Sequence, residues 1–430
     1  MKTDTLDKYL EILHKYWGYP DFRGIQREII ESIGSGNDTL GLMPTGGGKS
    51  LTFQVPALAQ KGVCIVITPL ISLMKDQVDH LRQKDIPAAA IYSGMRHDDI
   101  VSTLENCVFG GIKLLYISPE RLGSELFQAK LSHTKVSFIT VDEAHCISQW
   151  GYDFRPSYLQ IAKVRELVPD APILALTATA TPEVIDDIQK QLAFKKENVF
   201  RMSYERKNLA YVVRNTEDKE TELIHILKSV GGSAIVYVRT RKRTRDVARM
   251  LVESNISATW YHAGLDPEVK SQRQEDWQNG KTRVIVATNA FGMGIDKPDV
   301  RLVIHPDAPS SIEAYFQEAG RAGRDGKKSY AVLLWNHRDE HTLRNRIDAT
   351  YPSKDYIRDV YEHLAYFFEV GVGSGQGTTF EFNIEKFSRV YKYFPLNVNS
   401  ALVLLQQAGY INYDPEPDTS ARVMFKLTRD

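Results

Sequence analysis

Short apolar runs bounded by polar tips recur along most of this chain. Each run of aliphatic, β-branched or aromatic residues predicts a buried strand, and a helical pattern of apolar positions follows most of them. The repeating order of strand, polar tip and helix predicts an α/β fold of doubly wound parallel sheets, with the polar tips along one edge. The predicted strands are residues 63–68, 113–118, 136–141, 172–176, 234–238, 258–264, 282–287 and 300–304.

The repeat is interrupted at residues 198–208, where charged residues replace the apolar pattern, and it restarts with the strand at 234–238. We therefore predict two α/β domains, residues 1–205 and 206–342, and a third region at 343–430. An amphipathic helix is predicted at 4–17, ahead of the first strand.

The third region has a different pattern. An aromatic-rich helix is predicted at 356–370, and the glycine-rich stretch 371–377 predicts a flexible loop. Two helices and two strands around an acidic tip then predict a winged helix; a capping bundle, or a wing that binds protein, is the alternative. Because the tip at 414–418 is acidic, nucleic-acid binding by this module is left open. The elements are 384–393, 398–408, 410–413 and 422–426.

Composition narrows the class of protein. The chain has 430 residues with 54 basic and 54 acidic side chains, so a nucleic-acid surface must come from local clustering of charge. Its three cysteines, at 64, 107 and 146, argue against a disulfide framework and favour a reducing compartment. Because the sequence shows neither a signal peptide nor an apolar run long enough to span a bilayer, we expect a cytoplasmic protein.

Residues 43–50, Met-Pro-Thr-Gly-Gly-Gly-Lys-Ser, predict a phosphate-binding loop. The strict pattern has glycine where Met43 stands, but the three glycines, Lys49 and Ser50 lie between an apolar strand and a helical pattern. Glycines let backbone N–H groups close on phosphates, and the helix N-terminus adds positive potential. Lys49 can then reach the β- and γ-phosphates, and Ser50 can ligate magnesium. A flexible loop is the alternative.

Asp142 and Glu143 end the predicted strand at 136–141, where an α/β sheet holds its ligand. One carboxylate can orient magnesium while its neighbour takes a proton from an attacking water. Trp150 and Phe154 follow closely, and aromatic side chains stack on bases. This stretch therefore predicts nucleotide hydrolysis beside a nucleic-acid contact. The alternative is that the carboxylates end the strand by chance and the aromatics belong to the core.

Two other groups of residues suit the same chemistry. The amide of Gln26 can read the edge of adenine, with Tyr19 and Arg23 on either side of the base, although a turn before a solvated helix is the alternative. Arg321 and Arg324 lie three apart among glycines and fit a pair that stabilises phosphoryl charge across a domain cleft. Solvated arginines at a helix end are the alternative there.

Taken in order, these motifs resemble the RecQ family of superfamily two DNA helicases. The resemblance covers about residues 9–335, and the continuation from Asp142 through Trp150 to Arg155 makes it specific. The matching segments are Phe22–Gln26, Met43–Ser50, Thr68–Gln77, Asp142–Gly151, Asp153–Pro156, Ala175–Ala180, Phe291–Pro298 and Gly320–Gly326.

The resemblance implies two RecA-like domains with ATP and Mg²⁺ between them. Catalysis is then assigned to Lys49, Asp142, Glu143, His145, Arg321 and Arg324. In this assignment Glu143 activates water, Arg324 is the more critical arginine, and Ser50 and Asp142 serve magnesium. Nucleotide binding is assigned to Tyr19, Arg23, Gln26, Thr45, Gly46, Gly47, Gly48, Lys49, Ser50 and Asp296.

The resemblance also implies an ATP-dependent DNA helicase with 3′–5′ polarity, acting on single-stranded DNA and on junctions with duplex in repair and recombination. Trp150, Phe154 and Arg155 match the family's aromatic-rich loop, which couples DNA binding to hydrolysis, and Lys75 is a further DNA contact. We expect a monomer without membrane association, and single-strand-binding protein is a candidate partner.

The chain departs from the family in one respect. RecQ proteins commonly carry a four-cysteine zinc module after the motor, but no cysteine follows Cys146, so we expect no zinc. His145 and Cys146 belong to the motor motif and are not interpreted as zinc ligands. Because the chain ends just after a predicted strand, the sequence leaves open whether it is part of a longer protein.

Two other functions are compatible with these motifs. One is an RNA helicase with the same motor, which the residues that follow Asp142 and Glu143 disfavour. The other is a nucleic-acid-binding regulator whose motor is degenerate, against which the intact Lys49, Glu143 and Arg324 argue.

Overall fold

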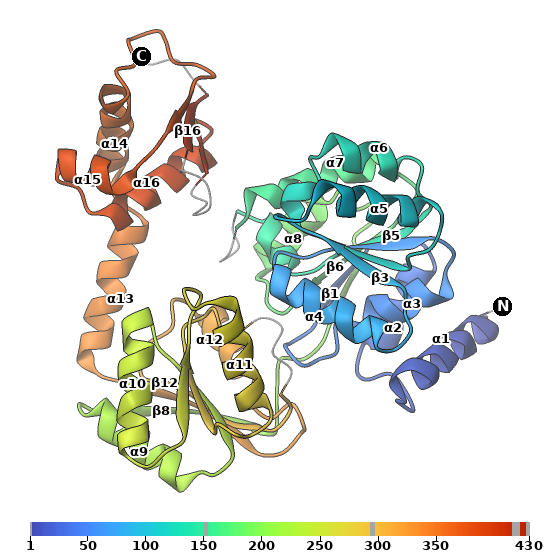
Figure 1. Ribbon diagram of the computed structural model, residues 1–430, viewed down its shortest axis with the longest axis horizontal. Coiled ribbons are helices and arrows are strands. Elements are labelled where there is room, and N and C mark those ends of the chain that lie inside the picture. The colour runs from blue at the N-terminus through green and yellow to red at the C-terminus, as the bar shows by residue number, and fades with distance from the viewer. Residues whose placement is uncertain (1, 150–153, 293–296, 415–421, 427–430) are drawn as a thin grey trace. The chain divides into compact units, whose positions relative to one another are not determined.

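The computed structural model describes residues 2–149, 154–292, 297–414 and 422–426. The chain divides into two compact units, Met1–Trp335 and Asn336–Asp430. Over the described residues, the first unit holds two parallel sheets and the second a small antiparallel sheet with helices (Figure 1). The domain boundary predicted at 342 falls inside helix α13 (His337–Thr350), and the proposed domain limits stay a prediction.

The first sheet has the strand order β3-β4-β2-β5-β6-β1-β7, with neighbouring strands parallel. Helices cover both of its faces (Figure 1), so its strands are continuous apolar runs rather than alternating ones. Strand β2, Val-Cys-Ile-Val-Ile, is buried at every position. The strands are β1 (Thr39–Leu42), β2 (Val63–Ile67), β3 (Ala88–Ile91), β4 (Leu114–Ile117), β5 (Val136–Val141), β6 (Ile173–Thr177) and β7 (Val199–Arg201).

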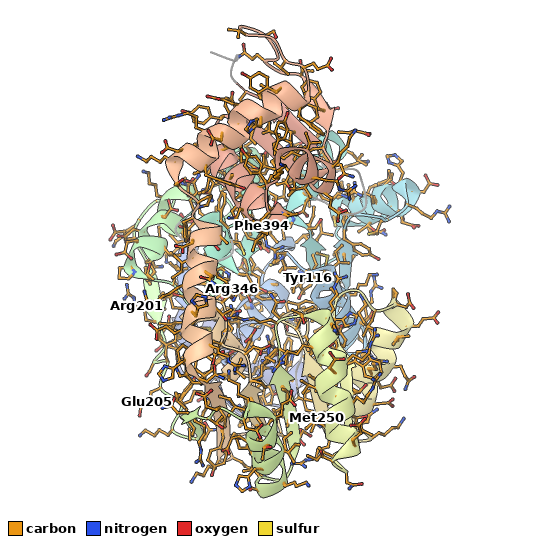
Figure 2. All side chains as sticks on the ribbon, turned by 90° about the vertical axis from the view of Figure 1, so that its left-hand side faces the viewer. Tyr116, Arg201, Glu205, Met250, Arg346 and Phe394 are labelled. Carbon is orange, nitrogen blue, oxygen red and sulfur yellow. The ribbon has the colours of Figure 1, made fainter. Side chains whose placement is uncertain are left out.

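Two apolar clusters pack the helices of this first lobe onto the opposite faces of its sheet. Tyr116 on β4 lies inside one cluster (Figure 2), and its hydroxyl accepts a hydrogen bond from Nε2 of Gln54 at 3.3 Å. The helices are α1 (Lys2–Trp17), α2 (Gln26–Gly34), α3 (Leu51–Ala59), α4 (Ile71–Arg82), α5 (His97–Val108), α6 (Glu125–Leu131), α7 (Gln160–Leu167) and α8 (Pro182–Gln191), with short turns η1 (Pro119–Arg121), η2 (Ala144–Ile147) and η3 (Pro156–Leu159).

The second sheet has the order β10-β11-β9-β12-β13-β8 and is also parallel between neighbouring strands. Trp277, fully buried, packs against Phe291 on one of its faces. The elements of this second lobe are β8 (Leu209–Asn215), α9 (Lys219–Ser229), β9 (Ser233–Tyr237), α10 (Arg241–Glu253), β10 (Ala258–Tyr261), α11 (Pro267–Gln278), β11 (Val284–Ala287), β12 (Val300–His305), α12 (Ile312–Ala319) and β13 (Ser329–Trp335).

The C-terminal unit builds an aromatic-rich core from helices and a sheet of order β14-β16-β15 with antiparallel neighbours. Its chain order of helix, strand, two helices and hairpin fits the predicted winged helix, and helix α13 precedes this arrangement without burying a side chain among the described residues. The remaining elements are α14 (Lys354–Phe367), β14 (Thr379–Glu381), α15 (Ile384–Tyr391), α16 (Pro395–Gln407), β15 (Ile411–Asp414) and β16 (Arg422–Phe425).

The predicted fold class is confirmed: two RecA-like parallel-sheet lobes precede a helical C-terminal region. The apolar pattern nevertheless missed strands β3, β7, β8, β13 and β14. Strand β3 is Ala-Ala-Ala-Ile, which has little intrinsic strand preference. Strand β7 lies within the charged interruption at 198–208 and pairs with β1, so that segment completes the first sheet before the chain leaves it.

Cys64, predicted to be a core thiol, lies on β2 and is fully buried. Burial raises its pKa to about 12, so the thiol is protonated and unreactive at neutral pH. Cys107 and Cys146 are also buried, and neither forms a disulfide. In the described part of the chain, no helix combines the length and the apolarity that crossing a membrane requires.

A buried carboxylate, Asp38, ties together segments that are distant in the sequence. It lies just before β1 and accepts hydrogen bonds from the backbone N–H groups of Ile173 and Lys195, each at 2.9 Å. Nη2 of Arg165 on α7 donates to the same carboxylate at 2.7 Å, and Nη1 of this arginine donates to the carbonyl of Leu192. These bonds satisfy both buried charges, because the carboxylate accepts three hydrogen bonds and the guanidinium donates to the carboxylate and to a carbonyl.

We predict that Asp38→Ala destabilises the first lobe by about 3–5 kcal/mol, because it leaves Arg165 buried without a counter-charge and two N–H groups without an acceptor. The first transition in urea unfolding measures this loss. Glu105→Ala is the matched control, because its ion pair with Lys130 is 3.2 Å long but exposed. That variant should lose less than about 1 kcal/mol. Equal losses in the two variants would contradict the structural role of Asp38.

Candidate nucleotide-binding and catalytic site

The predicted phosphate loop connects the end of β1 with the start of α3. Gly46 and Gly48 adopt φ angles of 79° and 76°, which glycine tolerates and other residues rarely adopt. Met43, which stands where the strict pattern has glycine, is fully buried in the apolar cluster of its lobe. The Met43 side chain therefore packs in the core and does not enter the loop. The loop keeps the glycine conformations that turn backbone N–H groups toward an anion.

Gln26 begins α2 and is buried against this loop. Its Nε2 donates hydrogen bonds to the carbonyls of Gly47 and Gly48, each at 3.1 Å, and its Oε1 accepts from the N–H of Arg23 at 2.8 Å. The amide predicted to read adenine is thus bonded to the phosphate loop in this structure. To read a base, it has to exchange these bonds for bonds to the nucleotide.

Asp142 and Glu143 follow β5 directly, at the same edge of the sheet as the phosphate loop. Glu143 has φ 49° and ψ 47°, a left-handed conformation that costs a non-glycine residue of order 1 kcal/mol or more and is common at functional sites. The turn is held by the N–H of Glu143, which donates to Oδ1 of Asp142 at 3.0 Å, and by Tyr158, whose hydroxyl donates to the carbonyl of Asp142 at 3.0 Å. It directs the Glu143 carboxylate toward Lys49, with 3.8 Å between Oε1 and Nζ.

The two carboxylates have opposite pKa shifts. Burial raises the pKa of Asp142 to about 6, and the neighbouring charge of Glu143 adds to this rise. Burial would also raise the pKa of Glu143, but Lys49, His145 and further cations outweigh it and hold that pKa below its usual value. Glu143 is therefore ionised at neutral pH, in the form that can orient a water molecule or accept its proton.

His145 is buried in turn η2 and is absent from the lining of the cavity that Lys49 and Glu143 face. Its Nδ1 is 2.8 Å from Oγ1 of Thr177 and 3.5 Å from Oε2 of Glu143. Thr177 is the last residue of β6, and its hydroxyl also donates to the carbonyl of Thr179. The histidine thus connects the Glu143 carboxylate to the end of the next strand, which suits a positioning role better than direct contact with a nucleotide.

The second lobe contributes Arg321 and Arg324 from the loop after α12. Arg321 is buried, and its Nη1 donates to the carbonyl of Gly292. Arg324 lies against the phosphate loop, because a Cβ built on Gly46 would be 3.1 Å from Cγ of this arginine. Both arginines face a cavity of about 610 Å³. Its lining includes Tyr19, Arg23, Gln26, Thr45, Gly46, Gly47, Gly48, Lys49, Ser50, Asp142, Glu143, Arg321 and Arg324.

These residues fit a nucleoside triphosphate with a divalent cation. Oγ1 of Thr45, Nζ of Lys49 and Oε2 of Glu143 are buried without a hydrogen-bond partner among the described residues. Buried polar atoms normally have partners, so a cation, a hydroxyl and a carboxylate that lack them mark a place for a polar ligand. Ser50 and Asp142 supply the oxygen ligands that Mg²⁺ prefers. Tyr19 and Arg23 lie together at the rim, 5.5 Å from guanidinium to ring centre.

The predicted DNA contacts are only partly described. Trp150 lies outside the described residues, as does Asp296, which was predicted to bind the nucleotide rather than DNA. Phe154 and Arg155 lie outside the cavity lining, but the charge of Arg155 is one of the cations that lower the pKa of Glu143. Lys75 is exposed on α4, and its Nζ lies 4.7 Å above the ring of Tyr92 rather than at the cavity.

Sequence reasoning gave no role to several residues of the cavity wall. Gln77 lies at the end of a recognised motif, and its Oε1 accepts a hydrogen bond from Gln54 at 3.0 Å. Gln317 lies three residues before the Gly320–Gly326 segment that carries the arginines, so its position in the sequence was a usable signal. Met202 belongs to the segment that connects β7 to β8 along the chain. This segment contains no recognised motif, so no sequence signal pointed to Met202.

Comparison with protein families agrees with this geometry. Residues 23–188 match the DEAD/DEAH box helicase family, and residues 218–326 match the helicase conserved C-terminal domain. The first match contains the phosphate loop and both carboxylates, and the second contains both arginines.

Curated relatives extend over both lobes. The ATP-dependent DNA helicase RecQ of Bacillus subtilis is 46% identical over 337 residues, which cover 78% of this chain and 57% of that protein. RecQ of Pasteurella multocida is 44% identical over 331 residues, covering 77% and 52%. The chain therefore spans about half the length of these RecQ proteins. The probable ATP-dependent DNA helicase RecS of Bacillus subtilis is 40% identical over 334 residues, covering 76% of this chain and 67% of that protein.

Solved structures share the fold at low identity. Saccharomyces cerevisiae Dbp5 bound to RNA and ADP BeF3 has a TM-score of 0.60 and 18% identity, covering 80% of this chain and 92% of that one. The helicase MrfA bound to DNA has a TM-score of 0.65 and 16% identity, covering 99% and 59%. These likenesses bear on the fold alone, whereas identities of 40–46% to named DNA helicases bear on ancestry. The chain belongs to the RecQ family of helicases.

Proposed function

We propose that this chain is the motor of an ATP-dependent DNA helicase, which couples ATP hydrolysis to 3′–5′ movement along single-stranded DNA and to duplex unwinding. One observation carries the proposal. A single cavity brings together a phosphate loop with Lys49, the Asp142 and Glu143 carboxylates of the first lobe, and two arginines of the second lobe. These are the parts that phosphoryl transfer to water requires.

Each side chain has a defined role in this proposal. The loop N–H groups and Lys49 bind the β- and γ-phosphates, while Ser50 and Asp142 hold Mg²⁺, which neutralises phosphate charge when bound. Glu143 orients the attacking water and takes its proton. Arg321 and Arg324 stabilise the charge that spreads over the transferred group, and they do so only when the second lobe faces the first.

Coupling to DNA is supported by the position of Arg155. Its N–H donates to the carbonyl of Cys146 at 2.8 Å, so it follows the carboxylate turn closely in space. Its charge also acts on Glu143. A nucleic-acid phosphate that drew this guanidinium away would change the field at the catalytic carboxylate, which gives the loop a physical route to the rate of hydrolysis.

Several finer properties rest on the family resemblance. We propose that the motor serves DNA repair and recombination, acts on single-stranded DNA and its junctions with duplex, and works as a cytoplasmic monomer. A partnership with single-strand-binding protein belongs to the same set of proposals. Nucleic-acid contact by the C-terminal winged-helix-like unit is not part of this proposal, because the sequence that follows Asp414 is acidic, with Glu416 and Asp418.

The central experiment measures ATP hydrolysis without nucleic acid, with single-stranded DNA and with single-stranded RNA of matched length. Selective stimulation by DNA is the expected result, followed by unwinding of a 3′-tailed duplex. Stimulation by RNA alone would replace the proposal with an RNA helicase. Absence of hydrolysis under all three conditions would reject the enzyme and leave a binding protein.

Lys49→Ala should abolish ATP turnover, because the phosphates lose their buried cation, while the fold stays intact. Hydrolysis should fall by at least about a hundredfold, as expected when a main electrostatic contact to the reacting group is removed. Circular dichroism and the melting temperature provide the test of folding. Lys61→Ala, an exposed lysine outside the cavity and without an assigned role, is the control for basal hydrolysis. Substantial residual turnover in Lys49→Ala would refute the assigned site.

Trp150→Ala should keep basal hydrolysis and lose stimulation by DNA, because the aromatic face that stacks on bases is removed. The ratio of rates with and without single-stranded DNA measures the effect. Trp150→Phe retains an aromatic face and should keep most of the stimulation. Full stimulation in the alanine variant would show that the loop assignment is wrong.

Binding of ATP with Mg²⁺ should weaken as the pH falls through about 6, where Asp142 gains a proton, and should be steady above pH 7. A protonated carboxyl is a poor ligand for Mg²⁺. The measurement is the Kd of a fluorescent ATP analogue with and without Mg²⁺, between about pH 5 and 8. Asp142→Asn separates this effect from titration of the nucleotide itself. In this variant Mg²⁺ should strengthen nucleotide binding less, and the remaining pH dependence of the Kd should reflect titration of the nucleotide alone. If the wild-type protein showed the same pH dependence as Asp142→Asn, the role of Asp142 would be contradicted.

A further inference from the structure

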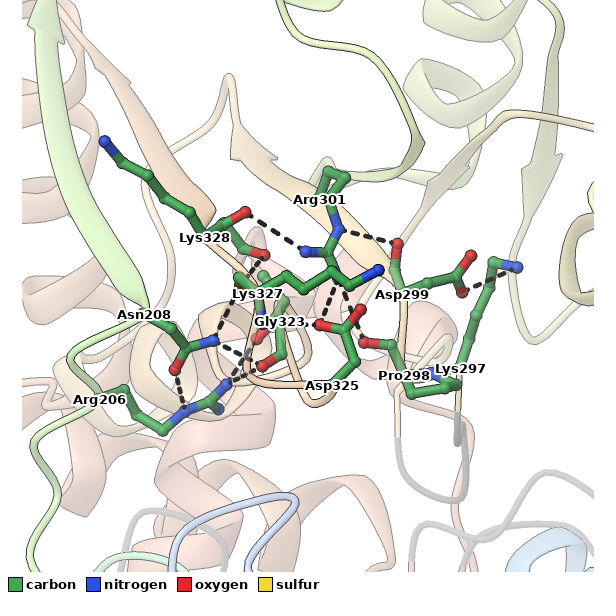
Figure 3. Close-up of polar contacts among 12 residues, drawn as sticks. Arg206, Asn208, Lys297, Pro298, Asp299, Arg301, Gly323, Asp325, Lys327 and Lys328 are labelled. Atoms are coloured by element: carbon green, nitrogen blue, oxygen red, sulfur yellow. Dashed lines mark hydrogen bonds and ion pairs between the residues drawn. The ribbon is translucent and has the colours of Figure 1, made fainter.

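The loop that carries the two arginines is anchored from outside its own sheet. We call residues 320–325 the arginine loop. Arg206, from the segment that joins β7 of the first sheet to β8 of the second, directs its guanidinium at three carbonyls of this loop (Figure 3). Nη1 donates to Gly320 at 3.3 Å, and Nη2 donates to Ala322 at 2.9 Å and to Gly323 at 2.7 Å. The carbonyls of Gly320 and Ala322 lie on either side of Arg321 in the sequence, and that of Gly323 immediately precedes Arg324.

Asn208, two residues further along the same segment, supports this anchor. Its Nδ2 donates to the carbonyls of Gly323 at 2.7 Å and Lys327 at 3.0 Å, and its Oδ1 accepts from Nε of Arg206 at 3.5 Å (Figure 3). Gly323 has φ 63°, and a Cβ there would lie 2.6 Å from Nδ2 of Asn208. The segment and the loop are therefore packed too closely for a side chain between them.

The other end of the arginine loop is held separately. Nη2 of Arg301 on β12 donates to Oδ1 of Asp325 at 2.6 Å, and its Nη1 donates to the carbonyl of Lys328 at 3.3 Å (Figure 3). Arg301 belongs to the second sheet, so this end is fixed within its own lobe. Arg206 and Asn208 are different, because they belong to the segment that joins β7 of the first lobe to β8 of the second. A rotation of one lobe against the other would therefore change the backbone of this segment.

We propose that Arg206 is a positioning residue for ATP hydrolysis, which sets Arg321 and Arg324 against the γ-phosphate and links their placement to the segment between the lobes. This inference rests on the proposed function. The guanidinium is suited to the role because its planar fork satisfies three carbonyls at once, whereas a lysine ammonium is a single compact donor group. Its positive charge also complements the partial negative charge at the C-terminal end of α12.

The test compares Arg206→Ala and Arg206→Lys with the wild-type protein in single-turnover ATP hydrolysis with saturating single-stranded DNA. Misplacement of the arginines should slow hydrolysis about 10- to 100-fold in the alanine variant, with a smaller loss in the lysine variant. The Kd for an ATP analogue should change less than about twofold, because the first lobe supplies most of that binding. Lys207→Ala, an exposed neighbour in the same segment, is the control and should match the wild-type rate.

Two further measurements separate positioning from general damage. In a background that lacks both Arg321 and Arg324, Arg206→Ala should cost less than about twofold, because the groups it positions are absent. Amide hydrogen exchange of residues 320–325 should be faster in Arg206→Ala and unchanged in Lys207→Ala.

A wild-type rate in Arg206→Ala, or an undiminished loss in the background without the arginines, would overturn the inference. If the wild-type protein does not hydrolyse ATP, the proposed function fails instead. Amide hydrogen exchange then still tests whether Arg206 holds the arginine loop, because unchanged exchange in Arg206→Ala would show that it does not.

Discussion

The Lys49 and Glu143 side chains face each other at 3.8 Å in a buried site, and neither charge is stable there alone. This constraint determines where both must lie along the chain. Lys49 follows β1 and Glu143 follows β5, and β6 alone separates these strands in the sheet. Because all three are parallel, their carboxyl ends meet at one edge. The sheet order therefore makes the pair, and the left-handed backbone of Glu143 completes it.

The same pair explains why one lobe is not a complete site. A lysine and a carboxylate can hold phosphate and water, but the charge that develops during transfer lies on the side away from the loop. Arg321 and Arg324 come from the second lobe and close the cavity from there. Their loop is held both by its own sheet, through Arg301, and by the segment between the lobes, through Arg206. In the proposed function, catalytic competence thus depends on the arrangement of the two lobes.

Much of this was readable from the sequence because it depends on local patterns. The phosphate loop, the carboxylates after β5 and the glycine-flanked arginines each combine a motif with an apolar strand or a helical pattern. What could not be read depends on packing. Nothing near Gln26 indicates that its amide bonds to the carbonyls of Gly47 and Gly48, and nothing in a charged stretch singles out Arg206. Strand β3 was missed because alanines carry little strand signal, and it is recognised only by its pairing with β4.

The Asp38 carboxylate has a consequence for how the chain is made. It bonds to Arg165 and to the N–H of Lys195, which lie 127 and 157 positions further along the sequence. A ribosome releases residues in order, so the carboxylate that precedes β1 has to wait for its partners until most of the first lobe has been synthesised. Contacts of such long sequence separation form late and slow folding. The nascent lobe therefore passes through a long interval in which β1 is present but its anchor is not, and this is the interval in which a chaperone would have the most to bind.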